Sequence, residues 1–354
     1  MRIRIRAFVM IIVILAFSIW AYADDSKNQG NLAYNFTKIA DGVYFAIGNG
    51  NMRVFSNSVV IINEDEVILV DSSTSPAAAR ALITDIKTLT TKPIRYVINT
   101  HFHFDHAHGN QVFGPGVEII GHEYTRKRLS GDILNSFTYL AFTSNLPEQI
   151  KSLQNQIACE TDTEKKKGLE KELELQTEFY NSQQELKPTP PNLTFNDRMS
   201  LFRGDREIRL LFLGIGHTAG DIFVYLPKEK ILCAGDFLMP RLSYMGDGYV
   251  DEWDDTLEKL KSIDFDVILP GHGDPLRTRD KIEHFQAYLR DLWFKTVDMR
   301  AKGASAEEVA KNIDLTEHAK NYPQITGPGA DIRAINRIYQ LLELRENNGS
   351  CCYD

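Results

Sequence analysis

One stretch of seven residues constrains this chain more than any other. It reads Thr100-His101-Phe102-His103-Phe104-Asp105-His106 and directly follows the strand-like run 94–99. His101 and His103 are two residues apart, so their side chains point to the same side of an extended chain. Asp105 and His106 follow at an expected helix start, where they face a second position nearby. Because imidazoles and carboxylates are ligands that divalent metals prefer, the stretch predicts a metal site and can supply ligands to two ions.

The first 23 residues are typical of a secretory signal peptide. Arginines at positions 2, 4 and 6 precede the apolar run 7–21, which ends in an Ala-x-Ala cleavage pattern. This apolar run is short for a membrane span. We therefore expect cleavage after Ala23, an exported periplasmic protein and no membrane contact beyond this segment. An uncleaved anchor is the alternative.

The composition indicates an acidic, soluble protein that acts on a small molecule rather than on nucleic acid. The formal net charge is -8, and removal of the three arginines of the leader makes it -11. Nucleic-acid-binding proteins need a basic surface, which this balance does not favour. The four cysteines are too few and too scattered for a disulfide framework. Two of them form the adjacent pair Cys351-Cys352, whose role the sequence leaves open.

The first part of the chain predicts an α/β domain. Strand-like runs occupy 43–47, 58–62 and 67–70, and the last two indicate a hairpin. Asp71 ends the third run, and Ser75-Pro76 then begins a helix that continues to about Leu89. The next predicted strand, 94–99, is followed directly by the histidine-rich stretch. Potential ligands just beyond the carboxyl end of a strand are typical of α/β sites.

A segment of different character, residues 126–191, interrupts this pattern. It lacks β-branched runs and is rich in charged, helix-favouring residues. Two apolar stripes at helical spacing predict a helical hairpin inserted into the main domain. The insertion is interpreted as a structural addition, a lid over the site or an arm for oligomerisation, and these three readings stay open.

Three further polar motifs follow predicted strands after the insertion. They are Gly216-His217-Thr218-Ala219-Gly220-Asp221, Ala234-Gly235-Asp236 and Pro270-Gly271-His272-Gly273. Residues 276–350 are then mostly helical in pattern and are expected to pack on the same domain. The organisation is therefore one domain, 32–275, interrupted by the 126–191 insertion and extended by C-terminal helices.

The ordered series H-x-H-x-D-H, then H, D and H, resembles the metallo-β-lactamase superfamily. The resemblance covers roughly residues 33–275 without the insertion, and it implies an α/β fold in the form of a four-layer αβ/βα sandwich with metals at one edge. It also implies two ligand sets, namely His101, His103 and His217 for one metal, and Asp105, His106 and His272 for the other, with Asp236 bridging both. Such ligands suit Zn²⁺, expected as a pair per chain, with iron or manganese as alternatives.

Three residues are candidates for supporting roles around these ligands. Asp71 matches a family position behind the site, and Asp221 follows the His217 motif. Both are candidates for holding a ligand imidazole in the tautomer that binds metal, with ordinary strand-end capping as the alternative. Arg241, five residues after Asp236, is a candidate for binding a substrate carboxylate or is simply a surface residue.

Two departures from family patterns narrow the expected activity. His103 stands where the di-iron flavoprotein branch has glutamate. Asp236 stands where the best-known lactamase class has cysteine, and Met239 replaces the lysine that binds the substrate carboxylate there. An aspartate at this position resembles glyoxalase II and the lactonases instead.

The resemblance therefore implies a metal-dependent hydrolase that cleaves a carbonyl bond in a lactone, thioester, ester or β-lactam. Asp105 is the expected catalytic residue, orienting a metal-activated water. Three alternatives remain: a β-lactamase in the strict sense, an iron-dependent oxidoreductase like a sulfur dioxygenase, and a non-catalytic metal-binding module that docks a partner.

Overall fold

Two β-sheets form the centre of the molecule. The computed structural model describes residues 32–348, so the predicted leader and the Cys351-Cys352 pair lie outside the described residues. The first sheet has the order β1 (Tyr34–Ala40), β2 (Val43–Gly48), β3 (Ser58–Ile62), β4 (Val67–Val70), β5 (Ile94–Ile98), β6 (Glu118–His122) and β7 (Leu193–Phe195). The second has the order β12 (Val267–Pro270), β11 (Ile231–Gly235), β10 (Phe223–Leu226), β9 (Arg206–Leu211) and β8 (Arg198–Arg203).

Both sheets are mixed and contain parallel as well as antiparallel pairs of strands. The first sheet is antiparallel from β1 to β4 and parallel from β4 to β7. In the second, β11 and β12 run parallel while the remaining neighbours are antiparallel. Because parallel strands end at the same edge, the loops after β4 and β5 lie together, as do those after β11 and β12.

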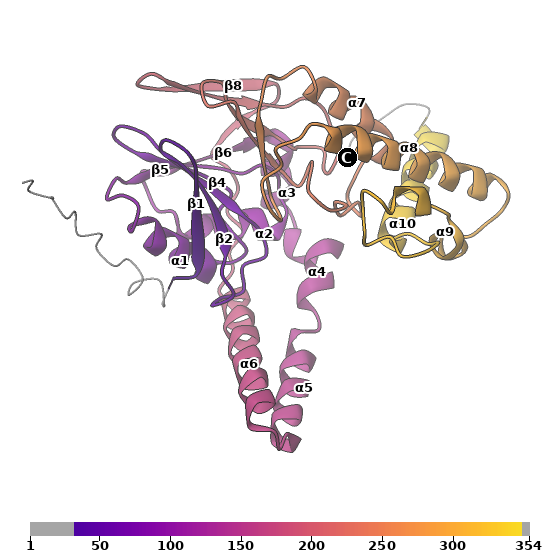
Figure 1. Ribbon diagram of the computed structural model, residues 1–354, viewed down its shortest axis with the longest axis horizontal. Helices are drawn as coiled ribbons and strands as arrows, with labels where there is room; N and C mark the ends of the chain where they lie inside the picture. Colours follow the sequence, from indigo (N-terminus) through magenta and orange to yellow (C-terminus); the bar gives the residue numbers. More distant parts are fainter. Residues whose placement is uncertain (1–31, 349–354) are drawn as a thin grey trace, which may run out of the picture.

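Successive side chains of a strand point to opposite faces of its sheet, and this alternation gives each sheet two packed faces in a four-layer sandwich. On β3, Val59 and Ile61 pack between the two sheets, whereas Val60 packs toward helix α1 (Pro76–Ile86) on the outer face. On β11, Cys233 lies between the sheets and Leu232 packs toward the opposite helical layer. The layers are therefore helix, sheet, sheet, helix, and the sandwich expected from the resemblance is confirmed (Figure 1).

The outer face of the second sheet is covered by α7 (Val250–Leu260) and by C-terminal helices. These are α8 (Asp280–Ala301), α9 (Ala306–Asn312) and α10 (Ile332–Asn348), with the 3-10 turn η5 (Thr316–His318) between the last two. Trp253 of α7 and Phe285 of α8 are fully buried and share one apolar cluster with Leu232 of the sheet. The C-terminal extension thus packs on the main domain rather than forming a separate unit.

The insertion is helical, as the sequence predicts. It contains most of α3 (Glu123–Ser130), which begins three residues before the predicted bound, and all of η4 (Ile133–Asn135), α4 (Phe137–Thr143), α5 (Leu146–Cys159) and α6 (Thr163–Gln184). Helices α5 and α6 form a hairpin that projects away from the sandwich, while α4 lies between this hairpin and the body of the protein (Figure 1). No helix within residues 32–348 has the length and apolar character needed to cross a membrane.

Candidate metal centre

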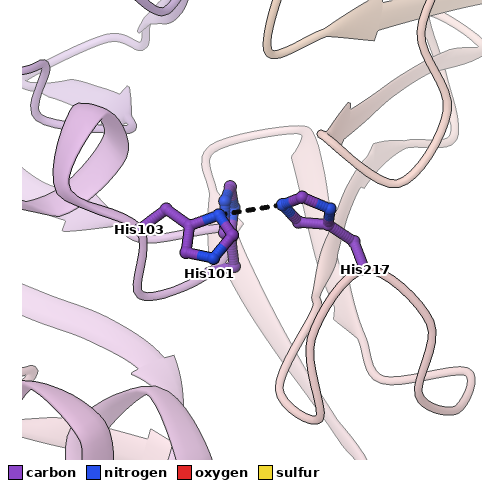
Figure 2. Close-up of side chains that lie close together, drawn as sticks. All are labelled: His101, His103 and His217. Carbon is purple, nitrogen blue, oxygen red and sulfur yellow. Dashed lines mark hydrogen bonds between the residues drawn. The ribbon is translucent and has the colours of Figure 1, made fainter. Parts of the chain in front are cut away.

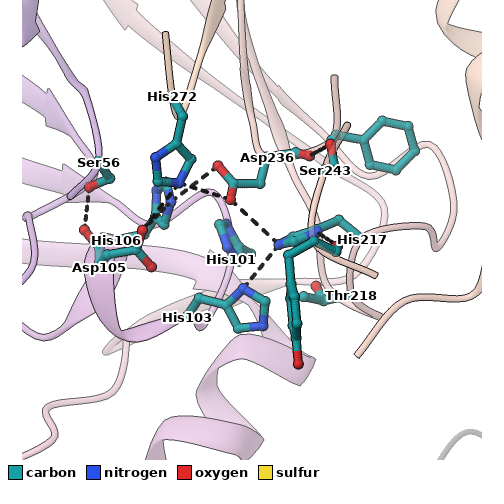
Figure 3. Close-up of polar contacts among 12 residues, drawn as sticks. Ser56, His101, His103, Asp105, His106, His217, Thr218, Asp236, Ser243 and His272 are labelled. Atoms are coloured by element: carbon teal, nitrogen blue, oxygen red, sulfur yellow. Dashed lines mark hydrogen bonds and ion pairs between the residues drawn. The ribbon is translucent and has the colours of Figure 1, made fainter. Parts of the chain in front are cut away.

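The seven predicted ligands meet at one edge of the sandwich. His101 and His103 lie in the loop after β5, and Asp105 and His106 lie in the first turn of α2 (Phe104–Ala107). The other three come from the second sheet: His217 from the β9–β10 loop, Asp236 from the residue after β11, and His272 from the loop after β12. Figure 3 shows these side chains pointing toward one another from segments far apart in the sequence.

The first predicted ligand set comprises His101, His103 and His217. One ring nitrogen from each lies within 4.8 Å of the others. His217 Nε2 lies 3.0 Å from His103 Nδ1, and the third imidazole packs beside both (Figure 2). All three side chains are buried, so they form a closed group of nitrogen donors.

The second predicted set comprises Asp105, His106 and His272, and Asp236 lies between the two sets. Asp105 Oδ2 is 3.2 Å from His272 Nε2 and 3.5 Å from His106 Nε2. Asp236 Oδ1 lies 3.2 Å from His106 Nε2, and its Oδ2 lies 3.1 Å from His272 Nε2 and 3.8 Å from His217 Nε2. One carboxylate therefore reaches ligands of both sets, which is the geometry of a bridging position.

Asp71 holds the His106 imidazole from behind. Its Oδ2 accepts a hydrogen bond from His106 Nδ1 at 2.8 Å, so that His106 Nε2 faces the centre. The same carboxylate accepts from Thr100 N and Thr100 Oγ1, each at 2.8 Å. Asp71 has a φ of 61°, a left-handed conformation that aspartate tolerates better than most residues. The structure thus places Asp71 where the sequence analysis expects a supporting carboxylate.

Two other imidazoles are held by groups that sequence reasoning did not identify. His103 Nε2 lies 3.0 Å from Asp247 Oδ2, and that carboxylate also accepts a hydrogen bond from Thr138 Oγ1 of α4. His217 Nδ1 donates to the Tyr244 carbonyl oxygen at 3.0 Å. These contacts leave His103 Nδ1 and His217 Nε2 facing the centre. Asp247 lies in a Gly-Asp-Gly loop eleven residues after Asp236 and outside the predicted motifs, so sequence reasoning did not single it out.

The structure places the Asp221 carboxylate against Thr218 rather than against a ligand imidazole, which agrees with the capping alternative. Its carboxylate accepts hydrogen bonds from Thr218 N and Thr218 Oγ1, both at 2.7 Å. It therefore closes the turn that carries His217 and stabilises the backbone rather than the ring. Burial raises the pKa of Asp221 to about 8, with the two Thr218 bonds opposing this effect.

The residues fit a pair of zinc ions. His101 Nε2 is buried without a hydrogen-bond partner, although buried polar atoms are almost always paired, and His106 Nε2 and Asp236 Oδ1 are buried with each other as neighbours at 3.2 Å. All three point into the centre, where a cation would satisfy them. Five imidazoles and two carboxylates match the nitrogen and oxygen donors that zinc prefers. Gly271 permits this crowding, because a Cβ there would lie 2.1 Å from Asp236 Oδ1.

The imidazoles differ in charge before metal binds. Burial lowers the pKa of His217 to about 3 and holds that of His101 well below its usual value, so both are neutral at neutral pH. Burial acts in the same direction on His272 and His106. The nearby carboxylates outweigh it, raising the pKa of His272 to about 10 and that of His106 well above its usual value. These two imidazoles are therefore protonated on both ring nitrogens and positively charged at neutral pH in the metal-free protein.

Zinc binding to the metal-free protein at neutral pH is expected to release about two protons per chain, from His106 and His272. Protons are released rather than taken up because the raised pKa values keep both imidazoles charged, and only a neutral imidazole can bind metal. Titration calorimetry in buffers of different ionisation enthalpy measures the proton release. Binding without proton release would contradict the assignment of these two side chains as ligands.

A large open cavity lies over the centre. It has a volume of about 1130 Å³ and is lined by His103, Asp105, Asp236 and His272 together with Arg241. Arg241 is exposed on the wall of this cavity, within the same open space as the predicted ligands. An arginine presents a planar fork of donors that matches a carboxylate. Its role in binding a substrate carboxylate stays a prediction.

Comparisons with known proteins agree with this architecture. The family model described as metallo-beta-lactamase superfamily matches residues 52–124 and 153–272, which is more than half of the chain. A linear primary-alkylsulfatase from Pseudomonas sp. (strain ATCC 19151) is 25% identical over 77% of this chain, which spans 53% of that protein. A metallo-beta-lactamase type 2 from Bacteroides fragilis is 23% identical over 78% of this chain and 93% of its own length.

Among solved structures, a metallo-beta-lactamase from Pontibacter korlensis superposes with a TM-score of 0.51 at 20% identity, covering 73% of this chain and 99% of its own. Fold and ligand set together define an αβ/βα sandwich with a histidine and aspartate metal centre at its edge. The chain belongs to the metallo-beta-lactamase superfamily.

Proposed function

We propose that this protein is an exported hydrolase that uses two zinc ions to cleave a carbonyl bond in a small molecule, in the class of lactones, esters, thioesters and lactams. The observation that carries the proposal is the position of Asp236, whose two oxygens reach ligands of both sets. Export is supported by the arginines and apolar run of residues 1–23.

Bound zinc would supply a water of lowered pKa and would polarise the scissile carbonyl oxygen. Asp105 is itself a predicted ligand, lies on the cavity surface and is suited to orient that water. Burial opposes ionisation of Asp105, but the charges of His106 and His272 outweigh it and lower the pKa to about 2. Asp105 is therefore ionised at neutral pH and accepts hydrogen bonds. Ser56 donates to the Asp105 carbonyl oxygen and so fixes the first turn of α2.

A β-lactamase in the strict sense, which hydrolyses antibiotics, is the second candidate, and it is supported by the Bacteroides fragilis relative, which the chain matches over 93% of that protein's length. Against it stand Asp236 and Met239, which differ from the best-known lactamase class. Sulfate-ester hydrolysis belongs in the same test because of the alkylsulfatase relative.

Elemental analysis of the purified protein, combined with a hydrolysis panel, tests the proposal. We expect about two zinc ions per chain, turnover of lactones or esters, loss of turnover with a chelator and recovery with zinc. Turnover of nitrocefin would support a β-lactamase, and turnover of an alkyl sulfate would support sulfate-ester hydrolysis. Stoichiometric iron with oxygen consumption would instead favour an oxidoreductase. A zinc-loaded protein that is inert on the whole panel would contradict the hydrolase assignment.

A further inference from the structure

An aromatic wall lines the cavity beside the metal centre. It consists of Phe55 from the loop before β3, Phe104 from α2 and Phe142 from α4 of the insertion. The ring centroids are 5.2 Å apart for Phe104 and Phe142, 6.2 Å for Phe55 and Phe104, and 6.5 Å for Phe55 and Phe142. Phe104 lies between the predicted ligands His103 and Asp105 in the chain. The wall lines the same cavity as these two predicted ligands and includes one ring from the insertion.

Two members of this aromatic wall are open to solvent. Phe142 is 48% exposed and Phe55 is 38% exposed, whereas Phe104 is buried behind them. Large apolar side chains that face a cavity next to polar catalytic groups are typical of a ligand-binding surface. A ligand that covers the two exposed rings would remove their apolar surface from water.

The insertion supports the wall and holds it in place. Phe179 of α6 packs edge-on against Phe55 with ring centroids 5.2 Å apart, and Tyr139 of α4 packs against Phe104 at 6.0 Å. Thr138, also on α4, donates to Asp247, the residue that contacts His103 Nε2. One short helix thus contacts both the metal-centre support and the aromatic wall, which gives the wall a defined position relative to the predicted ligands.

We propose that the aromatic wall binds an extended apolar group of the substrate, so that the substrate is a carbonyl compound with a medium or long alkyl or aryl chain. This inference rests on the proposed function for the bond that is cleaved. The cavity of about 1130 Å³ is slightly larger than the roughly 300–1,000 Å³ typical of pockets for drug-sized ligands, and it greatly exceeds the needs of a short ester. The insertion then acts as a specificity element rather than as a spacer, with Phe142 as its main contact.

A chain-length series tests this inference. Each methylene buried against the wall is expected to raise kcat/KM about fourfold until the wall is covered. The zinc-loaded protein should therefore favour p-nitrophenyl octanoate over p-nitrophenyl acetate by at least about a hundredfold. The variant Phe142→Ala should lower kcat/KM for the octanoate about tenfold more than for the acetate, because the acetate cannot reach the ring.

A matched control is available on the same helix. Phe137 is 65% exposed and lies on α4, but it does not line the cavity. The variant Phe137→Ala should leave the preference for the octanoate unchanged, with zinc content and circular dichroism equal to those of the parent. Equal losses on both esters for Phe142→Ala, or an equal effect of the two variants, would overturn the proposal.

Binding of alkyl hydroxamates separates this inference from the proposed function. Octanohydroxamate is expected to bind the zinc-loaded protein more tightly than acetohydroxamate, and Phe142→Ala should remove most of the difference measured by calorimetry. If this pattern appears without turnover of any ester, the binding surface is supported and the proposed hydrolase function is wrong. If esters are cleaved without dependence on chain length in turnover or binding, the hydrolase function stands and the aromatic wall is not a substrate site.

Discussion

Replacing Asp236 by alanine is expected to lower kcat/KM by on the order of 10³-fold and to reduce the zinc content of the protein, since loss of metal assistance removes several kcal/mol of transition-state stabilisation. The physical reason is the position of the carboxylate, which lies within 3.1–3.8 Å of three imidazole nitrogens. Without it, the two ligand sets are no longer joined and five imidazoles have only one carboxylate to offset the charge of the metals. Elemental analysis and steady-state kinetics on the best panel substrate measure both effects.

The control for this variant is Asp266→Ala, which removes an exposed carboxylate just before β12 in the same sheet. It should retain zinc and activity. If Asp236→Ala kept full zinc stoichiometry and parental turnover, the bridging assignment would have to be abandoned. Circular dichroism shows whether the sandwich is intact, which is expected because most of its core lies away from this edge.

Replacing Asp71 by alanine is expected to lower the free energy of unfolding by about 3–5 kcal/mol, because it breaks a buried pair and leaves other donors unsatisfied. The carboxylate accepts three hydrogen bonds of 2.8 Å, two from Thr100 and one from His106. Zinc affinity should also fall, by about 10–100-fold, since His106 loses the group that orients it. Chemical unfolding of the metal-free protein and a zinc competition titration measure the two effects separately.

A second variant of Asp71 identifies which property of its side chain matters, and a variant of Asp65 is the control. Asp71→Asn keeps a side chain that tolerates the left-handed backbone, so it should be less destabilised than Asp71→Ala while still weakening zinc binding. Asp65→Ala, at the exposed turn of the same hairpin, should change neither quantity. An unfolding free energy unchanged in Asp71→Ala would refute the structural role assigned to this carboxylate.

Much of the fold follows from local sequence patterns. The β3–β4 hairpin, the helix opened by Ser75-Pro76 and the strand β5 occur where the sequence predicts them. The edge strand β1 was not predicted, because it pairs with β2 alone and its residues are mostly half-exposed or polar. Strand β6 was not predicted either, since its five residues include a glycine and a histidine and offer only a short apolar run.

The supporting contacts of the site were less accessible to sequence reasoning. Asp71 was a candidate because it matches a family position behind the site, and the structure places it against His106. Asp221 was a candidate because it follows the His217 motif, yet it accepts hydrogen bonds from the backbone and hydroxyl of Thr218. Two aspartates in similar local contexts thus have different partners. Only the path of the neighbouring loops decides which group lies within hydrogen-bonding distance.

The sequence by itself determined the ligand types and the class of protein. Four predicted ligands lie within six residues of the chain, and each remaining one follows a predicted strand in a motif with its own glycine, so short-range patterns contain the information. The tertiary structure alone decided that Asp236 reaches both predicted ligand sets, that Asp247 contacts His103, and that Phe142 of the insertion lines the cavity beside the centre. These contacts join residues that are distant along the chain. The distances between their atoms depend on how the sheets and helices pack, and a local sequence pattern does not predict that packing.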